Sequence, residues 1–462
     1  MAVMPGTCGM EANKMGKSRT AGRRLLAGIL LVVLLTAGLG VAPAARAATI
    51  NVPAGDVDAL IAALAAANDT PGPDVIVLAA GATYTLTEGT IQIASPVKIV
   101  GNGATLTLSD TAPEFSILSV AAETSATLQQ VRISNGRYLF GSGINNAGTL
   151  TLIDSLVSDN YGSFAGAGIF NTGTMTLIDS TVNGNDAEVA GGIINFATMT
   201  LINSTVSNNT AESVGGGIGN IGTLTLTNST ISGNSAGENT GGMINEGTLT
   251  LTNSTVSGNS AANDGGGIVN TSTATLTNTL VAGNTSQTGP DISGTVSGTF
   301  NLIGDGSGMT GLMDGFDGNQ VGTSQAPIDP RLGPLADNGG PTQTHLPGLD
   351  SPAINAADTA SGPDTDQRGV SRPYSDASDI GAVEVQLHSD LCALTQAKVR
   401  EAAVARSACA MLQIAQVAEQ QGNVMLEQLA VTNYQLQIRS AQGRRYISSA
   451  DAAMLMNWAT FL

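Results

Sequence analysis

The sequence predicts an all-β protein, a parallel β-solenoid with about 25 residues per turn, and two observations support this fold class. A six-residue block with the pattern Leu/Met/Ala-Thr-Leu-Ile/Thr-Asp/Asn-Ser/Thr recurs at spacings of 24 or 25 residues. Each repeat also holds three short runs of strand character and shows no helical period. Because these runs are too short for helices, successive repeats are expected to stack as turns about 4.8 Å apart. The blocks begin at Leu150, Met175, Met199, Leu224, Leu249 and Ala274.

Three columns of polar residues keep the same register as the blocks. Stacked amides can hydrogen-bond along a column, and Asn also tolerates the left-handed backbone of tight corners. We therefore interpret the first column as a structural Asn ladder and not as a binding site. Its members are Asn160, Asn185, Asn209, Asn234, Asn259 and Asn284. The second column holds Asn146, Asn171, Asn195, Asn220, Asn245 and Asn270, and the third holds Asp154, Asp179, Asn203, Asn228, Asn253 and Asn278.

The repeat extends toward the amino terminus with less regularity, so we assign residues 48–304 to the solenoid and its cap. Residues 56–68 are amphipathic, with Val57, Leu60, Ile61 and Leu64 on one face, and would form a helix that covers the exposed end of the solenoid. The strands expected between this helix and the regular repeats cover residues 75–78, 84–86, 91–93, 97–100, 105–108 and 127–133.

Two segments follow the regular repeats. Residues 305–386 are predicted to be an irregular carboxy-terminal part of the β-helix, and residues 387–462 an α-helical tail of two or three helices. The tail is expected to break near Gly422-Asn423 and near Gly443, and it would pack on itself or on the solenoid, or serve oligomerisation or attachment. Its expected apolar stripe comprises Leu394, Val399, Ala403, Met411 and Ile414.

Cys392 and Cys409 lie in this tail. One continuous helix would hold the two residues about 25 Å apart, so a disulfide requires a turn between them. The sequence leaves their pairing open.

The first 47 residues have the pattern of a secretory signal peptide. Basic residues precede an apolar run over 25–41, and Ala45-Arg46-Ala47 resembles a cleavage site. Export by the general secretory route is expected, with twin-arginine export through Arg23-Arg24 and an uncleaved membrane anchor as alternatives. No later stretch is apolar enough to span a membrane. The expected location is therefore secreted or at the cell surface.

The charge balance excludes nucleic acid and anionic membranes as natural partners. The chain has 18 Lys and Arg against 36 Asp and Glu, a net charge of −18. Cleavage after Ala47 would remove six basic residues and one acidic residue and leave a net charge of −23.

Five motifs after the repeats resemble the carboxy-terminal region of choice-of-anchor Q proteins. They are residues 330–335 (PRLGPL), 337–342 (DNGGPT), 351–355 (SPAIN), 366–369 (DQRG) and 379–384 (DIGAVE). That family consists of exported bacterial right-handed parallel β-helix proteins related in fold to pectate lyases, and the likeness covers roughly residues 48–386. The repeats alone also resemble those of polymorphic outer-membrane proteins. The resemblance implies a right-handed coil and a surface or extracellular location, and little about activity. The sequence departs from the family pattern because no sorting motif or membrane tail follows Glu384.

Residue chemistry argues against a uronate lyase, which needs Arg or Lys and Ca²⁺ along the flank of the solenoid. Residues 138–330 contain no Lys, Arg or His. A hydrolase would need two carboxylates, for which Asp154 and Asp179 are the candidates, since they share one register and could lie about 5 Å apart. The same register carries Asn203 in the next repeat, which favours a structural role for this position.

The segments that vary most between repeats are expected to form loops along one edge of the solenoid. Tyr138, Phe140, Tyr161 and Phe164 are candidate ligand-binding residues, because aromatic faces suit sugar rings, although packing against the cap would explain them equally well. Later repeats carry acidic residues in these segments, which serve solubility or Ca²⁺ binding. A Gly/Asp-rich loop with Asp305, Asp314, Asp317 and Asn319 offers a weak Ca²⁺ site. Asp366 and Arg368 are expected to tie the terminal segment together.

The sequence thus predicts an exported β-helix protein whose function is adhesion or binding, with a glycan or cell-surface protein as ligand and without enzymatic activity. No cofactor is implied beyond Ca²⁺. Two alternatives stay open: a carbohydrate-active hydrolase or lyase acting along the solenoid flank, and a passive structural matrix protein.

Overall fold

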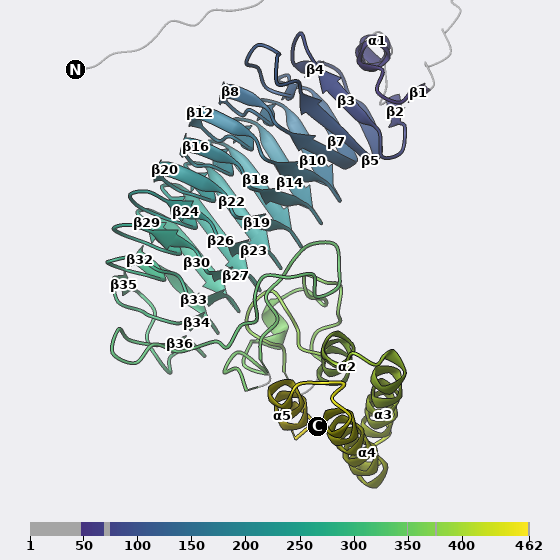
Figure 1. Cartoon of the computed structure of the whole chain (residues 1–462). Helices are drawn as coiled ribbons and strands as arrows, with labels where there is room; N and C mark the ends of the chain where they lie inside the picture. The colour runs from purple at the N-terminus through teal and green to yellow at the C-terminus, as the bar shows by residue number, and fades with distance from the viewer. Residues whose placement is uncertain (1–47, 69–73, 349, 375–376, 461–462) are drawn as a thin grey trace, which may run out of the picture. The chain divides into compact units, whose positions relative to one another are not determined.

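The computed structural model describes residues 48–68, 74–348, 350–374 and 377–460. They form a right-handed parallel β-helix followed by a helical region, which confirms the predicted fold class. Figure 1 shows the strands stacked turn upon turn along the solenoid. The predicted signal peptide, residues 1–47, lies outside the described residues.

The strands of the described residues belong to three parallel sheets. Sheet A contains β1 (Thr49–Val52), β2 (Asp74–Leu78), β3 (Thr83–Leu86), β5 (Val97–Leu108), β7 (Ser125–Ser134), β10 (Thr149–Ile153), β11 (Leu156–Ser158), β14 (Thr174–Ile178), β15 (Thr181–Asn183), β18 (Thr198–Ile202), β19 (Thr205–Ser207), β22 (Thr223–Thr227), β23 (Thr230–Ser232), β26 (Thr248–Thr252), β27 (Thr255–Ser257), β30 (Thr273–Thr277), β31 (Leu280–Val281), β33 (Ser297–Thr299), β34 (Leu302–Ile303) and β36 (Gln320–Val321). Sheet B contains β4 (Ile91–Ile93), β6 (Leu118–Val120), β9 (Ile144–Asn146), β13 (Ile169–Asn171), β17 (Ile193–Asn195), β21 (Ile218–Asn220), β25 (Met243–Asn245), β29 (Ile268–Asn270), β32 (Ile292–Thr295) and β35 (Met309–Thr310). Sheet C contains β8 (Arg137–Phe140), β12 (Tyr161–Ala165), β16 (Asp186–Val189), β20 (Thr210–Val214), β24 (Ser235–Ala236) and β28 (Ser260–Ala261).

One turn shows the path of the chain, which runs through β10 and β11 of sheet A, β12 of sheet C and β13 of sheet B. Each strand pairs in register with its counterpart in the next turn, as in Val157 with Val182 and Ile169 with Ile193. Sheet C corrects one expectation. The variable segments, predicted to be loops, begin with short strands that stack like the rest of the repeat. Residues 97–108, predicted as two strands, form the single strand β5 with a register shift between Val100 and Ala104.

The core consists of columns of identical or similar side chains. Inward-facing positions of sheet A alternate with outward-facing Thr, so Leu150 and Leu152 are fully buried whereas Thr149 is exposed. Repetition then places Leu over Leu through successive turns. One such column comprises Leu152, Leu177, Leu201, Leu226, Leu251 and Leu276, all fully buried.

The Asn160 column forms a buried, hydrogen-bonded ladder. In each step the side-chain amide and the backbone N–H of one Asn donate to the side-chain oxygen of the Asn one turn later, as from Asn185 to Asn209 at 2.9 and 3.0 Å. Asp291 ends the ladder by accepting both bonds from Asn284, and burial raises the pKa of Asp291 to about 6. The Asn146 column forms a second ladder with side-chain bonds of 2.6–2.8 Å.

The left-handed backbone belongs to other positions. It occurs along the Asp/Asn column, where φ is 48° at Asp154 and 51° at Asp179 and at Asn278, and not at the ladder residues themselves. Asp and Asn suit this corner because their short polar side chains tolerate positive φ better than most others do. Amide stacking and corner formation are therefore carried by different columns.

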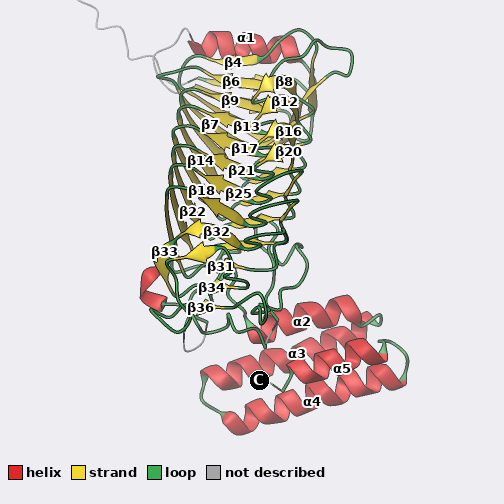
Figure 2. Ribbon diagram, turned by 90° about the vertical axis from the view of Figure 1, so that its left-hand side faces the viewer, coloured by secondary structure: helices red, strands yellow, loops and turns green. Residues whose placement is uncertain are grey.

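Helices close the solenoid and follow it (Figure 2). Helix α1 (Val57–Asn68) lies over the end of the coil and buries Leu60 and Leu64 in the main core, in agreement with the predicted cap. Ile61, predicted on the same face, is exposed instead. The helical region contains α2 (Leu387–Lys398), α3 (Ala402–Gln420), α4 (Val424–Gly443) and α5 (Ser449–Trp458). Breaks near Gly422 and after Gly443 were predicted, but the break at Val399–Glu401 was not.

That missed break allows Cys392 of α2 and Cys409 of α3 to form a disulfide. The predicted apolar stripe was partly wrong, because Ala403 and Ile414 are exposed and the buried face of α3 is formed by Ala405, Ala408 and Leu412 instead. An all-round mixture of Ala and aliphatic residues gives several equally good stripes, so the period alone could not select one.

The described residues of 341–386, here called the strap, have little regular structure and pack along the corner between the two strands that each turn contributes to sheet A. Buried charges hold the strap together. Arg368 pairs with Asp366 at 3.0 Å, as expected, and Arg372 donates to Glu384 at 3.1 Å and to two backbone carbonyls. Burial and the neighbouring Glu384 raise the pKa of Asp379 to about 7. The motifs at residues 366–369 and 379–384 therefore take part in the internal bonding of the strap.

The buried ladder predicts a large cost for removing one amide. Asn209→Ala is expected to lower the free energy of unfolding by about 2–4 kcal/mol, because the backbone and side-chain N–H groups of Asn185 and the carbonyl of Val182 lose their partner. Urea denaturation measures the effect. Thr198→Ala, at an exposed position of β18, is the control and should change stability by less than about 0.5 kcal/mol; equal losses in both variants would contradict a ladder that stabilises the fold.

His388 predicts a dependence of stability on pH. Its ring is buried in α2, and burial lowers its pKa to about 4 from the ordinary value of 6.5. Between pH 6.5 and about pH 4 the unfolded chain binds a proton at this residue that the folded chain does not bind. Protonation therefore favours the unfolded state, and the free energy of unfolding falls as the pH drops through this window. Compared with His388→Met, which does not titrate, the native protein should lose several degrees of melting temperature between pH 6.5 and 4; parallel curves would contradict this.

Candidate functional site

A groove runs along the corner between the two strands of sheet A in the amino-terminal turns. It has a volume of about 740 Å³ and is here called the corner groove. Its lining is polar and comes from four successive turns and the edge of the strap. The lining residues are Asn102, Gly103, Gln130, Val131, Arg132, Asp154, Ser155, Leu156, Asp179, Thr181, Asn183, Pro341, Thr342 and Gln343.

Asp154 and Asp179 lie side by side in this groove. Each follows a strand of sheet A, and the preceding residues Ile153 and Ile178 are paired in register. Gln130 donates to Oδ2 of Asp154 at 3.0 Å, and Asn203 donates to Oδ1 of Asp179 at 3.1 Å. No amide lies between the two carboxylates, since both residues of this step are acidic. The pair can accept further hydrogen bonds or bind a positive group.

The strap covers the same corner in the following turns. Its backbone and side chains bond to the corner from Asn203 to Asn278, and its Pro341–Gln343 edge forms the end of the groove. The corner groove is therefore the part of the corner that the strap does not occupy. Sequence reasoning proposed the Asp pair but missed the groove. The groove depends on how far the strap, which begins over 160 residues after Asp179, extends along the corner.

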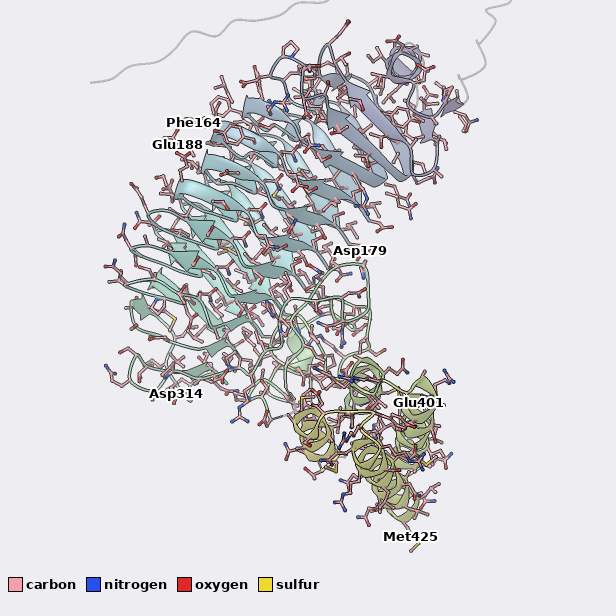
Figure 3. The ribbon with its side chains drawn as sticks, viewed as in Figure 1. Phe164, Asp179, Glu188, Asp314, Glu401 and Met425 are labelled. Carbon is pink, nitrogen blue, oxygen red and sulfur yellow. A yellow bond between two sulfur atoms is a disulfide. The ribbon has the colours of Figure 1, made fainter. Side chains whose placement is uncertain are left out.

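The predicted aromatic residues lie on a different edge (Figure 3), where Phe164 and Glu188 are opposite Asp179. Tyr138 and Phe140 of β8 pair with β12, which carries Tyr161 and Phe164. The ring of Phe140 contacts those of Phe164 and Phe170, each with centroids 5.3 Å apart, and Phe170 contacts Phe196 at 5.4 Å. These residues form one surface feature, here called the aromatic ridge: Tyr138, Phe140, Tyr161, Phe164, Phe170 and Phe196.

The ridge is open to solvent. The exposed fractions of Tyr138, Tyr161, Phe164 and Phe196 are 40%, 50%, 47% and 43%, respectively. The four Phe rings contact one another in sequence, and Phe140 and Phe170 pack on a small apolar base that includes Ala190 and Ile194. Phe170 and Phe196 were missed by sequence reasoning, although a signal existed: Phe170 occupies the outward position of a Gly-Ile-x-Asn run and Phe196 follows the next such run.

Acidic residues adjoin the ridge. Asp186 pairs with Tyr161 across β12 and β16, and burial together with the charge of Glu212 raises the pKa of Asp186. Glu188 and Glu212 are exposed on the following strands. These carboxylates make the edge negative beyond β12, and residues 138–330 contain no cation to offset them. Arg137 of β8, in register with Tyr161, is the cation that adjoins the ridge.

The candidate Ca²⁺ residues serve local turns. Asp305 accepts from the backbone of Ser307, Asp314 accepts from the backbone of Val321, and buried Asn319 accepts from Asn301 and forms a short ladder step with it. Asp317 has a φ of 50° and supplies a left-handed corner. Among the described residues no three His, Cys, Asp or Glu side chains gather in a way that would hold a metal ion. Calcium binding stays a prediction.

Comparisons with known proteins do not identify a family: no family model, curated protein or solved structure matches the chain. The resemblance to choice-of-anchor Q proteins therefore stays a prediction. In the part of the chain that the structure describes, no helix has the length and apolarity needed to cross a membrane.

The missing amide between Asp154 and Asp179 predicts that Asp179→Asn stabilises the protein. The new side chain would donate to Asp154 and remove the repulsion between two neighbouring carboxylates at an exposed corner, a gain of about 0.5–1 kcal/mol. Thermal unfolding at low salt measures the gain. The matched change Asp159→Asn, at an exposed left-handed corner outside the pair, should have little effect. A lower melting temperature for Asp179→Asn would show that the carboxylate itself is needed by the fold.

Proposed function

We propose that this protein is exported and binds an extended glycan through the aromatic ridge, as an adhesion or binding protein that does not cleave its ligand. The observation that carries the proposal is the exposure of four aromatic side chains on three consecutive turns: Tyr138 of β8, Tyr161 and Phe164 of β12, and Phe196 after β17. Rigid aromatic side chains give large contact areas at little cost in conformational entropy.

The charge of the ridge edge selects the class of glycan. Asp186, Glu188 and Glu212 would repel uronate or sulfate groups. The cation of the ridge strands, Arg137 of β8, already donates to the carbonyl of Ser109 at 2.9 Å. A neutral polysaccharide, whose apolar sugar faces stack on rings and whose hydroxyls donate to carboxylates, fits this edge best. A cell-surface protein is the other ligand that an exposed apolar ridge suits.

Export rests on the pattern of residues 1–47 and is supported by the disulfide between Cys392 and Cys409, because disulfides persist mainly in oxidising compartments. The family resemblance supports the same location.

Oligomerisation or attachment through the helical region belongs to the proposal as well. Support comes from large apolar side chains that are exposed on α3 and α4. They are Ile414, Val417, Val424, Met425, Leu429 and Leu436.

A glycoside hydrolase is the second candidate, and the corner groove with Asp154 and Asp179 is the observation in its favour. Neighbouring strands place such a pair about 5 Å apart, the separation of a retaining pair. Both carboxylates nevertheless lie at an open corner that Asn residues occupy in the later turns.

The test is a panel of neutral and acidic polysaccharides, scored for retention of the purified protein and for release of reducing or unsaturated ends. We expect retention by neutral chains without cleavage, and about a tenfold loss of affinity in Tyr161→Ala and in Phe164→Ala. Phe316→Ala is the matched control, because Phe316 is 61% exposed but lies outside the ridge.

Two results would overturn the proposal. Equal affinity of the ridge variants and the native protein would remove the ridge as the binding site. Cleavage that is lost in Asp154→Ala or Asp179→Ala would establish the hydrolase instead.

A further inference from the structure

We propose that the corner groove binds an extended, basic polypeptide segment of a partner protein, which would continue the strap along the solenoid. This inference concerns a different site from the aromatic ridge and does not depend on glycan binding. It rests on how the strap occupies the rest of the corner, on the shape of the unoccupied part, and on the charge of that part.

The solenoid bonds to the side chains of Thr342, His345 and Gln367 of the strap and also to the strap's backbone. The side chain of Asn228 donates to the carbonyl of Thr365 at 2.7 Å, and Thr205 donates to the carbonyl of Gln343 at 2.7 Å. Asn278 both donates to the carbonyl of Asp358 and accepts from its N–H, at 2.9 and 2.8 Å. Further along, the N–H of Ala382 donates to the hydroxyl of Thr255 at 2.9 Å, and the N–H of Gly381 donates to the carbonyl of Asn278 at 2.8 Å. The latter bonds use only backbone groups of the strap, so a polypeptide of another sequence could make them as well.

The corner groove presents the same two positions one turn earlier, whereas two turns earlier the Thr position holds Leu156. Thr181 is paired in register with Thr205, and Asp179 stands where Asn203 stands in the next turn. The hydroxyl of Thr342 donates to the carbonyl of Asn203 at 2.8 Å, so the strap touches the last covered turn where the groove begins. The groove spans four turns, from Asn102 to Asp179. Three steps of about 4.8 Å give about 14 Å, enough for four extended residues.

The charge of the groove indicates the chemistry of the occupant. Under the strap the corner side chains are Asn, which donate and accept. The groove carries Asn102 and Gln130 at this corner in its first two turns, and Asp154 and Asp179, which only accept, in the two turns next to the strap. The bonds from Gln130 and Asn203 use one oxygen of each carboxylate, which leaves the other oxygen available to a donor from a ligand. Lys or Arg next to backbone N–H groups supplies such donors, and the net charge of −18 attracts a cation. Exposed Arg132 at the other end would meet an acidic group of the peptide.

A glycan fits this groove less well than a peptide does. The rest of the corner is filled by the strap, a polypeptide that is held in part by bonds to its amide N–H and carbonyl groups. The groove also lacks the exposed aromatic rings on which sugar faces stack, since its lining contains none. Glycan binding in the groove would therefore contradict the proposal.

The experiment measures fluorescence anisotropy of a labelled peptide, acetyl-Pro-Thr-Lys-Thr-Lys-Thr-amide, which copies the strap edge and adds basic residues. We expect saturable binding that weakens with salt, and no binding of the same peptide with Glu in place of Lys. Asp154→Asn/Asp179→Asn should weaken the Lys peptide at least tenfold. This double variant uses the residue type of the later turns, so its fold should be retained, and a melting curve verifies this.

Two further variants separate groove binding from general attraction to an acidic protein. Glu188→Gln/Glu212→Gln removes the same number of charges at the ridge edge and should leave peptide affinity within twofold. Thr181→Val removes only the hydroxyl that would bond to the peptide backbone and should weaken binding about threefold to tenfold. Equal losses in both acidic double variants, no saturable binding, or displacement of the peptide by a polysaccharide would each overturn the proposal.

Discussion

The structure depends on one constraint: each regular turn must place an amide in the same buried position. The ladder residues from Asn160 to Asn284 are almost completely shielded from water, and each one after Asn160 supplies the acceptor for two donors of the turn before it. An unpaired polar group in such a place costs about 1–3 kcal/mol. A repeat that slipped by one residue would lose these bonds and also turn its Leu column outward. The ladder therefore fixes the register on which all surface features depend.

Because the interior is set by the period, variation is confined to outward-facing positions and to the ends. Asp291 shows what happens where the period fails: a carboxylate replaces the amide and still accepts both bonds from Asn284. At the outer edge, sheet C keeps its backbone pairing while its side chains change from aromatic in β8 and β12 to acidic in β16 and β20. A rigid coil thus presents different chemistry along one edge without a change in fold.

The sequence predicts the solenoid, its period and its amino-terminal helix well, because each depends on a pattern of neighbouring residues. It predicts less where bonding is not local. The break at Val399–Glu401 joins two Ala-rich segments with no Gly or Pro, and Cys392 and Cys409 could be paired only once that break was known. The strap is a similar case. Its Asp366-Gln367-Arg368 motif was visible, but Gln367 bonds to Thr205 and Thr230 of the solenoid, which no spacing reveals.

The candidate sites differ in the same way. The aromatic ridge follows from residue type and register, so four of its six members could be named from sequence. The corner groove has no motif of its own, since its two Asp residues lie in a column that is Asn under the strap and Gln130 in the turn before them. Its existence depends on the strap beginning at Pro341, and its chemistry depends on Asp in place of Asn in the two uncovered turns next to the strap. Under the strap, Asn228 donates to the strap and Asn278 both donates and accepts, which a carboxylate could not do. In the two turns next to the strap this demand is absent and two adjacent acceptors remain, although an amide at either position would give the fold a further hydrogen bond. That pair of carboxylates is the reason to regard the groove as a binding surface.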